Sequence, residues 1–301
     1  MTAARVAAID LGSNSTRLLV ADVRDGDIAE LERLLRITRL GDGVDRSGRL
    51  ADDAMGRVSQ VVDSYVERAR NLAATRILAV ATSAVRDAGN GRDFLAALAD
   101  RHGIAWRILT GDEEAAMTFR GVTSRSAPSA ETLICDIGGG STELVLGGPD
   151  GVAAQISLNI GCVRMSERHL ASDPPTADEV AGLRAATREA LPALTREARV
   201  LIGVAGTVTT LATVDRGLEQ EIPEEIDGHR LTAEAVERLL AELAALPLAA
   251  RREVRGLMPE RAPTIVAGAA ILAEVLRATS LPHLTVSERD ILHGAVLAAA
   301  A

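Results

Sequence analysis

"AAIDLGSNSTRLLV" occupies Ala7–Val20, and "ICDIGGGSTELVLG", at Ile134–Gly147, follows the same plan. In each stretch an apolar strand delivers an Asp, Asp10 or Asp136, and a glycine-containing turn and a second apolar strand follow. The two Asp residues are 126 positions apart (136 minus 10), which is about the length of one domain. The repeat therefore predicts a duplicated α/β domain, each copy a mixed sheet flanked by helices.

The chain of 301 residues is long for a single hydrophobic core, so two domains are expected. The stretch "TSRSAPSAE", Thr123–Glu131, is rich in Ser and Pro and is typical of a linker. We expect an N-terminal domain at residues 1–122 and a C-terminal domain at residues 123–301, with the two glycine turns facing each other across an interdomain cleft. This division leaves open whether the last helix packs back on the first domain.

The composition limits the classes of function. Hydrophobic residues make up 47% of the chain but aromatic residues only 1%, so Ala, Leu and Val must build the cores. The net charge of −9 argues against a nucleic-acid binder. All 33 basic residues are Arg, which excludes a P-loop lysine and a Schiff-base lysine. With two cysteines, Cys135 and Cys162, and no stretch that could cross a bilayer, we expect a cytoplasmic protein.

The two turns have the chemistry of phosphate cradles. Glycines allow a close backbone approach, successive N–H groups form an anion-binding nest, and hydroxyl groups add donors. The candidate phosphate-binding residues are Gly12, Ser13, Asn14, Ser15 and Thr16 in the first turn and Gly138, Gly139, Gly140, Ser141 and Thr142 in the second. Because an Asp beside each turn would repel a bare phosphate, a divalent cation is expected between carboxylate and phosphate. One such turn alone would be read as an ordinary loop; its recurrence favours a binding site.

Six segments carry a resemblance to a known family: "AIDLGSNSTRLLV", "ATSAVRDAGN", "TGDEEAAMTFRGV", "ICDIGGGSTELVLG", "SLNIGCVRMSERHL" and "LIGVAGTVTTLA". In this order they resemble the motifs of the exopolyphosphatase / guanosine pentaphosphate phosphohydrolase (Ppx/GppA) family, in its short two-domain form. That family belongs to the superfamily of actin, the sugar kinases and the heat-shock chaperone ATPases. The resemblance implies actin-like (ribonuclease H-like) domains, dependence on Mg²⁺ or Mn²⁺, a homodimer, and removal of the terminal phosphate from inorganic polyphosphate.

The resemblance also implies roles for individual residues. Asp10, Asp136 and Glu143 are expected to bind the metal. Glu114, the second Glu of "GDEEA", is expected to be the base that activates water, with Glu113 as the weaker candidate, and Arg86 is expected to grip phosphoryl oxygens. The further substrate-binding candidates are Asn90, Arg164, Gly206 and Thr207, the last two either at distal phosphates or as a helix cap.

Three alternatives remain open at this stage. Guanosine pentaphosphate (pppGpp) would use the same phosphate-reading site as polyphosphate. A phosphotransferase of the same superfamily is a second class, disfavoured because a water-activating Glu114 would waste the donor. A non-catalytic actin-like scaffold is a third class, disfavoured by the full set of acids.

Overall fold

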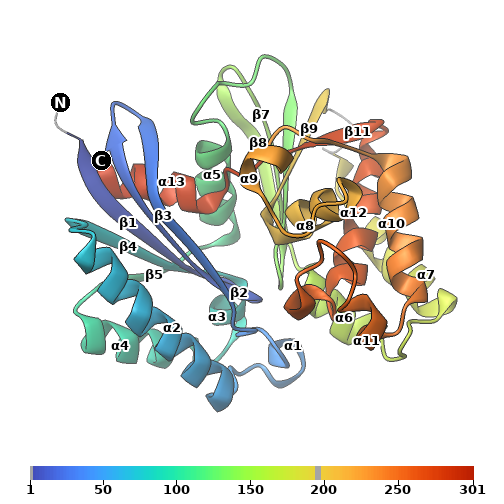
Figure 1. Cartoon of the computed structure of the whole chain (residues 1–301), viewed down its shortest axis with the longest axis horizontal. Coiled ribbons are helices and arrows are strands. Elements are labelled where there is room, and N and C mark those ends of the chain that lie inside the picture. Colours follow the sequence, from blue (N-terminus) through green and yellow to red (C-terminus); the bar gives the residue numbers. More distant parts are fainter. Residues whose placement is uncertain (1–2, 194–197) are drawn as a thin grey trace. The chain divides into compact units, whose positions relative to one another are not determined.

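The computed structural model describes residues 3–193 and 198–301, which form two compact units (Figure 1). Unit 1 comprises Met1–Ala127 together with Arg289–Ala301, and unit 2 comprises Pro128–Glu288. The expected boundary after residue 122 thus falls five residues short of the structural one (127 minus 122), within the Ser/Pro-rich stretch. The last helix belongs to unit 1.

Unit 1 has a sheet of five strands among its described residues, in the order β3-β2-β1-β4-β5. The first three strands are antiparallel, and β4 and β5 run parallel to β1. The strands are β1 (Ala4–Leu11), β2 (Ser15–Arg24), β3 (Asp27–Ile37), β4 (Arg76–Ala81) and β5 (Trp106–Ile108). The helices are α1 (Val44–Ser47), α2 (Asp52–Asn71), α3 (Ser83–Asp87), α4 (Gly91–His102), α5 (Gly111–Val122) and α13 (Ile291–Ala300).

The alternation of side chains along β1 and β2 builds two hydrophobic layers in unit 1. Ala7, Ile9 and Leu11 of β1 pack with α2 and α4. Val6 and Ala8 point to the opposite face and pack with α13, which lies along the sheet (Figure 1). Asp10 continues the second series, so its side chain lies on the α13 face.

Unit 2 has a sheet of six strands among its described residues, in the order β10-β11-β9-β6-β7-β8. The strands are β6 (Thr132–Ile137), β7 (Thr142–Gly148), β8 (Gly151–Leu158), β9 (Val200–Val204), β10 (Arg230–Thr232) and β11 (His283–Val286). The helices are α6 (Cys162–His169), α7 (Ala177–Ala190), α8 (Ala205–Asp215), α9 (Pro223–Ile226), α10 (Ala233–Ala245), α11 (Leu248–Arg251) and α12 (Ile265–Thr279), with a 3₁₀ turn at Pro259–Arg261.

The core of unit 2 lies on one face of its sheet. Leu133, Cys135 and Ile137 of β6 join a large cluster that includes most of α12, a helix buried almost along its whole length. Asp136 lies between Cys135 and Ile137 in the chain, so its side chain points to the opposite face.

The two sheets repeat one plan, which confirms the predicted duplicated α/β fold. In unit 2, β8-β7-β6 is an antiparallel set, as β3-β2-β1 is in unit 1. The next strands, β9 in unit 2 and β4 in unit 1, run parallel to the central strand in both sheets. The two Asp turns therefore join equivalent strands, β1 and β2 in unit 1 and β6 and β7 in unit 2.

No helix within residues 3–193 and 198–301 has the length and hydropathy needed to cross a membrane. Both cysteines are buried and free, so no disulfide supports either core.

Candidate functional site

The two glycine turns have the same backbone geometry. The N–H of Gly12 donates to the carbonyl of Ser15 at 3.0 Å, and the N–H of Gly138 donates to the carbonyl of Ser141, also at 3.0 Å. A Cβ atom on either glycine would lie 3.1–3.2 Å from that same carbonyl, so glycine suits the tight closure of both turns. The repeat seen in the sequence is thus a repeat in three dimensions.

Both turns direct their carbonyl oxygens into the protein. The Ser13 carbonyl accepts from the N–H of Gly41 at 2.7 Å, and the Gly139 carbonyl accepts from the N–H of Val163 at 2.8 Å. Among the described residues, no hydrogen bond uses the N–H groups of Ser13 and Asn14 or those of Gly139, Gly140 and Ser141. An anion nest requires amide N–H groups that are not used in hydrogen bonds within the protein. Both turns meet this condition in the part of the chain that the structure describes, because their carbonyl groups are bonded and these amides are not.

The first turn is linked to the neighbouring α3 helix. The hydroxyl groups of Ser13 and Ser83 lie 2.8 Å apart, and Thr82 donates its N–H to the Leu11 carbonyl. Thr16 pairs its hydroxyl with that of Thr38 at 2.9 Å. The bonds of Ser83 and Thr82 fix the turn against the helix that carries Arg86, and the Thr16–Thr38 bond fixes it against the residue that follows β3.

The second turn is held by the start of α6. The N–H of Cys162 donates to the Gly138 carbonyl at 2.9 Å, and the Arg164 Nε donates to the Gly140 carbonyl at 2.7 Å. The α6 helix can approach this closely because residue 161 is glycine; a Cβ there would lie 2.4 Å from the Gly139 carbonyl oxygen. Arg164, predicted as a phosphate ligand, therefore also supports the turn.

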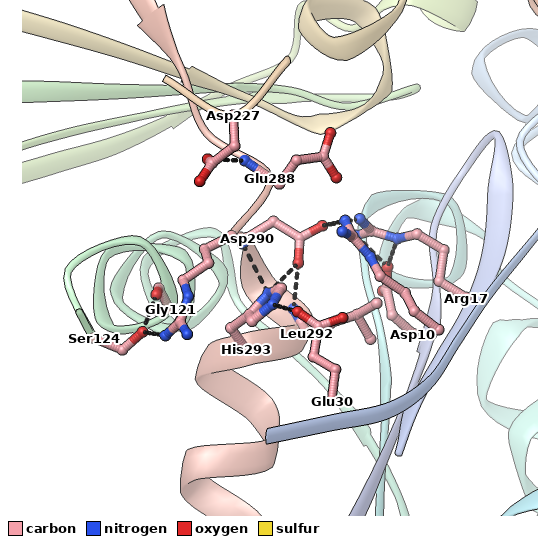
Figure 2. A network of polar contacts seen from close by, with 12 residues as sticks. Asp10, Arg17, Glu30, Gly121, Ser124, Asp227, Glu288, Asp290, Leu292 and His293 are labelled. Carbon is pink, nitrogen blue, oxygen red and sulfur yellow. Dashed lines mark hydrogen bonds and ion pairs between the residues drawn. The ribbon is translucent and has the colours of Figure 1, made fainter. Parts of the chain in front are cut away.

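The acidic residues differ in their cross-strand neighbours. Asp10 lies opposite Arg17, whose Nε and Nη2 both donate to Asp10 Oδ2, at 3.0 and 2.6 Å (Figure 2). Asp136 lies opposite Glu143, and Ser157 donates its hydroxyl to Glu143 Oε1 at 2.6 Å. Burial raises the pKa of Asp10, and Arg17 acts against that shift.

The acids fit a divalent cation that keeps water and phosphate in its coordination shell. Asp10 Oδ1 is buried and has no hydrogen-bond partner, and the carboxylates of Asp136 and Glu143 are both buried on one hairpin. Within residues 3–193 and 198–301, no group of three or more His, Cys, Asp or Glu is placed so that it could hold a metal ion. Mg²⁺ commonly binds through one or two carboxylates plus substrate phosphates and waters, which agrees with this arrangement.

The structure separates the two adjacent Glu residues of α5. Glu113 forms a capping box with Thr110, and its carboxylate accepts from the Thr110 N–H at 2.9 Å. That backbone hydrogen bond holds the pKa of Glu113 below its usual value. Glu114 is buried instead, and Arg86 Nη1 donates to its Oε2 at 3.1 Å. Glu113 thus has a structural task, while Glu114 and Arg86 form a pair in the part of unit 1 that holds the first turn.

Asn90 has contacts that differ from those expected of a phosphate ligand. Its side-chain oxygen accepts from the Leu50 N–H at 2.8 Å, and its nitrogen donates to the Leu50 carbonyl at 3.0 Å. Both ends of the amide therefore hold a loop 40 residues away in the chain.

Gly206 and Thr207 lie in the first turn of α8, which begins at Ala205 directly after β9. Because β9 runs parallel to β6, with Val204 beside Asp136, α8 starts at the sheet edge where the second turn lies. A Cβ on Gly206 would overlap the guanidinium of Arg261, so an arginine lies against this position. Burial raises the pKa of Cys162, which shares this region with Thr207 and Arg261, so the thiol is not an activated nucleophile.

Sequence patterns did not single out several supporting residues. Ser157 and Gly161 act on the second turn, and Asp290 contacts Arg17 from the last helix. Asp290 precedes the apolar run "ILHGAVLAAA", which is an N-cap signal, but nothing in that pattern indicates its partner 273 residues away.

Comparisons with known proteins identify the family and the fold. The Ppx/GppA phosphatase family model matches residues 19–300. The chain is 39% identical to exopolyphosphatase 2 of Mycobacterium tuberculosis, with all of both chains covered. A solved exopolyphosphatase from Cytophaga hutchinsonii superimposes with a TM-score of 0.89 at 27% identity, covering 97% of this chain and 96% of that one. The Ppx/GppA enzyme of Aquifex aeolicus superimposes with a TM-score of 0.85 at 31% identity, covering 98% and 99%.

Proposed function

The chain belongs to the Ppx/GppA phosphatase family, and from that premise we propose that it is a metal-dependent exopolyphosphatase that releases terminal orthophosphate from inorganic polyphosphate. The observation that carries the proposal is the matched pair of turns. Each one has a buried Asp before it, carbonyls bonded to the protein, and amide donors without an acceptor. A polyphosphate offers the repeated anionic groups that such turns can bind.

Mg²⁺ or Mn²⁺ is the proposed cofactor, with Asp10, Asp136 and Glu143 as its acidic ligands. The cation, when bound, would stabilise the negative charge on the phosphate oxygens, including the charge that develops during hydrolysis. Like charges directly opposite each other on paired strands are unfavourable, so Asp136 and Glu143 create a strong attraction for a cation. Ser157 orients Glu143 by its hydrogen bond.

Glu114 is the proposed general base, which takes a proton from the attacking water. Its neighbour Arg86 donates to one carboxylate oxygen, which orients the acid for that step. The guanidinium of Arg86 carries further donors, which are suited to phosphoryl oxygens. Asn90 supports this region by holding the loop at Leu50, and Gly206 and Thr207 remain proposed contacts for distal phosphates.

The setting of the enzyme is part of the same proposal. Free, buried cysteines are typical of a reducing compartment, which favours the cytoplasm. A homodimer is proposed as the working form. A chain with a net charge of −9 needs a local basic surface to hold a long polyanion, and a dimer would extend that surface from one subunit to the next. Analytical ultracentrifugation at micromolar concentration tests the dimer, and a strictly monomeric active enzyme would rule it out.

A phosphate-release assay tests the function. The purified chain is given polyphosphates of several lengths, guanosine pentaphosphate and ATP, each with and without Mg²⁺. We expect the highest kcat/KM with polyphosphate and no activity in chelator, and we expect Glu114→Gln to lower turnover by about two to four orders of magnitude. Preferential hydrolysis of guanosine pentaphosphate would identify the other substrate of the same site, and transfer of phosphate to an added acceptor would reject hydrolysis.

A further inference from the structure

Arg17 lies between two buried carboxylates in unit 1. Its Nε and Nη2 donate to Asp10 Oδ2, and its Nη1 donates to Oδ2 of Asp290 (Figure 2). The side chains of Asp10 and Asp290 are only 2% and 3% exposed. Arg33 is farther from Asp290, at 3.8 Å, and more exposed than Arg17. One guanidinium is therefore shared by two acids, and Asp290 also has Arg33 and His293 near it.

Strand geometry explains why these side chains meet. Val6 and Ala8 on β1, and Leu19 and Ala21 on β2, point to the face covered by α13. Asp10 and Arg17 continue these two series by steps of two residues, so they point to the same face. Asp290 is the N-cap of α13, so it lies at the N-terminal end of the helix that covers this face.

Asp290 is held firmly where it meets Arg17. Its Oδ1 accepts from the Leu292 N–H at 3.0 Å, and its own N–H donates to His293 Nδ1 at 3.1 Å. His293 is fully buried and contacts Glu30 through Nε2 at 3.0 Å. A Cβ at Gly121 would lie 2.0 Å from the Asp290 carbonyl oxygen, so α5 packs directly against this point.

We propose that Asp290 is a positioning residue for Asp10 and acts through Arg17. Arg17, anchored by Asp290, engages Oδ2 of Asp10 and leaves Oδ1 as the single oxygen that serves the cation. Because Asp290 shares the positive charge of Arg17, Asp10 keeps more of its attraction for that cation. This inference rests on the proposed function, since it assigns Asp10 to the metal–phosphate unit.

Asp290→Asn tests the proposal with little disturbance to the helix. Asn is as good an N-cap as Asp, but its one acceptor is used by the cap, so its amide cannot accept from Arg17. We expect the Kd for Mn²⁺ alone, measured by electron paramagnetic resonance, to rise roughly three- to tenfold, as loss of one nearby charge implies. Saturating Mn²⁺ should restore turnover, which a distorted fold would not allow.

Asp22→Asn is the matched control. Asp22 lies on the same β1–β2 hairpin and pairs with Arg5 in the same cross-strand manner, at 2.8 and 2.9 Å, away from the turn. We expect it to change the Kd for Mn²⁺ by no more than about twofold, because Asp22 is partly exposed and lies at the other end of the hairpin from Asp10, where its charge is screened. Equal affinities of the two variants for Mn²⁺ would overturn the inference.

A double-mutant cycle with Arg17→Gln tests the route of the effect. If Asp290 acts through Arg17, adding Asp290→Asn to Arg17→Gln should not weaken Mn²⁺ binding further. A full additional loss of affinity would show that Asp290 acts as an independent charge and would reject the proposal. Wild-type protein that binds no Mn²⁺ would instead reject the metal dependence in the proposed function, which separates the two failures.

Discussion

Asp136 and Glu143 lie directly opposite each other across the β6–β7 hairpin, in the place that Asp10 and Arg17 hold in the β1–β2 hairpin. The two turns thus share a backbone design and differ in charge. The β6–β7 hairpin pairs two acids at this place, whereas the β1–β2 hairpin pairs an acid with an arginine. Both acids of the β6–β7 hairpin are proposed metal ligands, so substitution of either one tests the metal site.

The first prediction concerns these two acids. Asp136→Asn and Glu143→Gln should each raise the Mg²⁺ concentration needed for half-maximal turnover by more than about tenfold, because each removes a charged oxygen ligand. Ser157→Ala should raise it less, since Ser157 only orients Glu143. The measurement is phosphate release across a Mg²⁺ titration in metal-stripped enzyme. Full activity in excess chelator would exclude a metal held by these residues.

The second prediction uses the adjacent pair on α5. Glu114→Gln should cut turnover by about two to four orders of magnitude while leaving polyphosphate binding intact, as expected for loss of a general base. Glu113→Gln should keep turnover near the wild-type value but lower the free energy of unfolding by about 0.3–1.5 kcal/mol, because it weakens the capping box with Thr110. Turnover and chemical denaturation are measured on both variants.

The reverse pattern, with turnover lost in Glu113→Gln and kept in Glu114→Gln, would exchange the two roles. The pKa of Glu113 is lowered in the folded state, so its contribution is present above its unfolded pKa and is lost as the pH falls through the folded pKa. The stability difference between wild type and Glu113→Gln should therefore shrink in acid.

Local sequence patterns were enough to predict the duplicated fold and both turns. The strands beside Asp10 and Asp136 are short apolar runs, and the Gly–Ser spacing of each turn determines its closing hydrogen bond. The capping box at Thr110 also follows from local spacing, and it separates Glu113 from Glu114 without reference to any distant residue.

Long-range partners could not be predicted in this way. The Asn90 amide is engaged by Leu50, and Arg17 is engaged by Asp290, which is 273 positions later. Such pairs depend on how the strands and helices pack, and no local pattern encodes them. The return of the chain to unit 1 at Arg289 is likewise a long-range feature that no local pattern indicates.

The third prediction concerns Arg86. Arg86→Ala should lower turnover by about 10²–10³-fold, because it removes both a donor for phosphoryl oxygens and the partner of Glu114. Arg92→Ala, at an exposed position on α4, should have little effect. In the wild type, added salt should raise KM for polyphosphate by screening the attraction between the site arginines and the phosphates. Equal activity of the two variants would remove Arg86 from the site.

The last prediction concerns the support of the second turn. The backbone at Gly161 has φ −135° and ψ 163°, which any residue can adopt, so only the missing Cβ matters there. In Gly161→Ala the new methyl group would lie 2.4 Å from the Gly139 carbonyl oxygen, and the turn or the start of α6 must move. We expect a loss of about 1–3 kcal/mol in unfolding free energy and up to about 100-fold in turnover, because the amide donors of the turn shift with it.

Gly182→Ala is the matched control. This glycine lies within α7, and the nearest atom to a Cβ placed there is His169 Nδ1, at 4.0 Å. Alanine at this position should stabilise the helix by about 1 kcal/mol. For both variants, chemical denaturation measures the unfolding free energy and phosphate release measures turnover. Wild-type turnover in Gly161→Ala would mean that the position of this turn does not govern catalysis, even if the stability falls as expected.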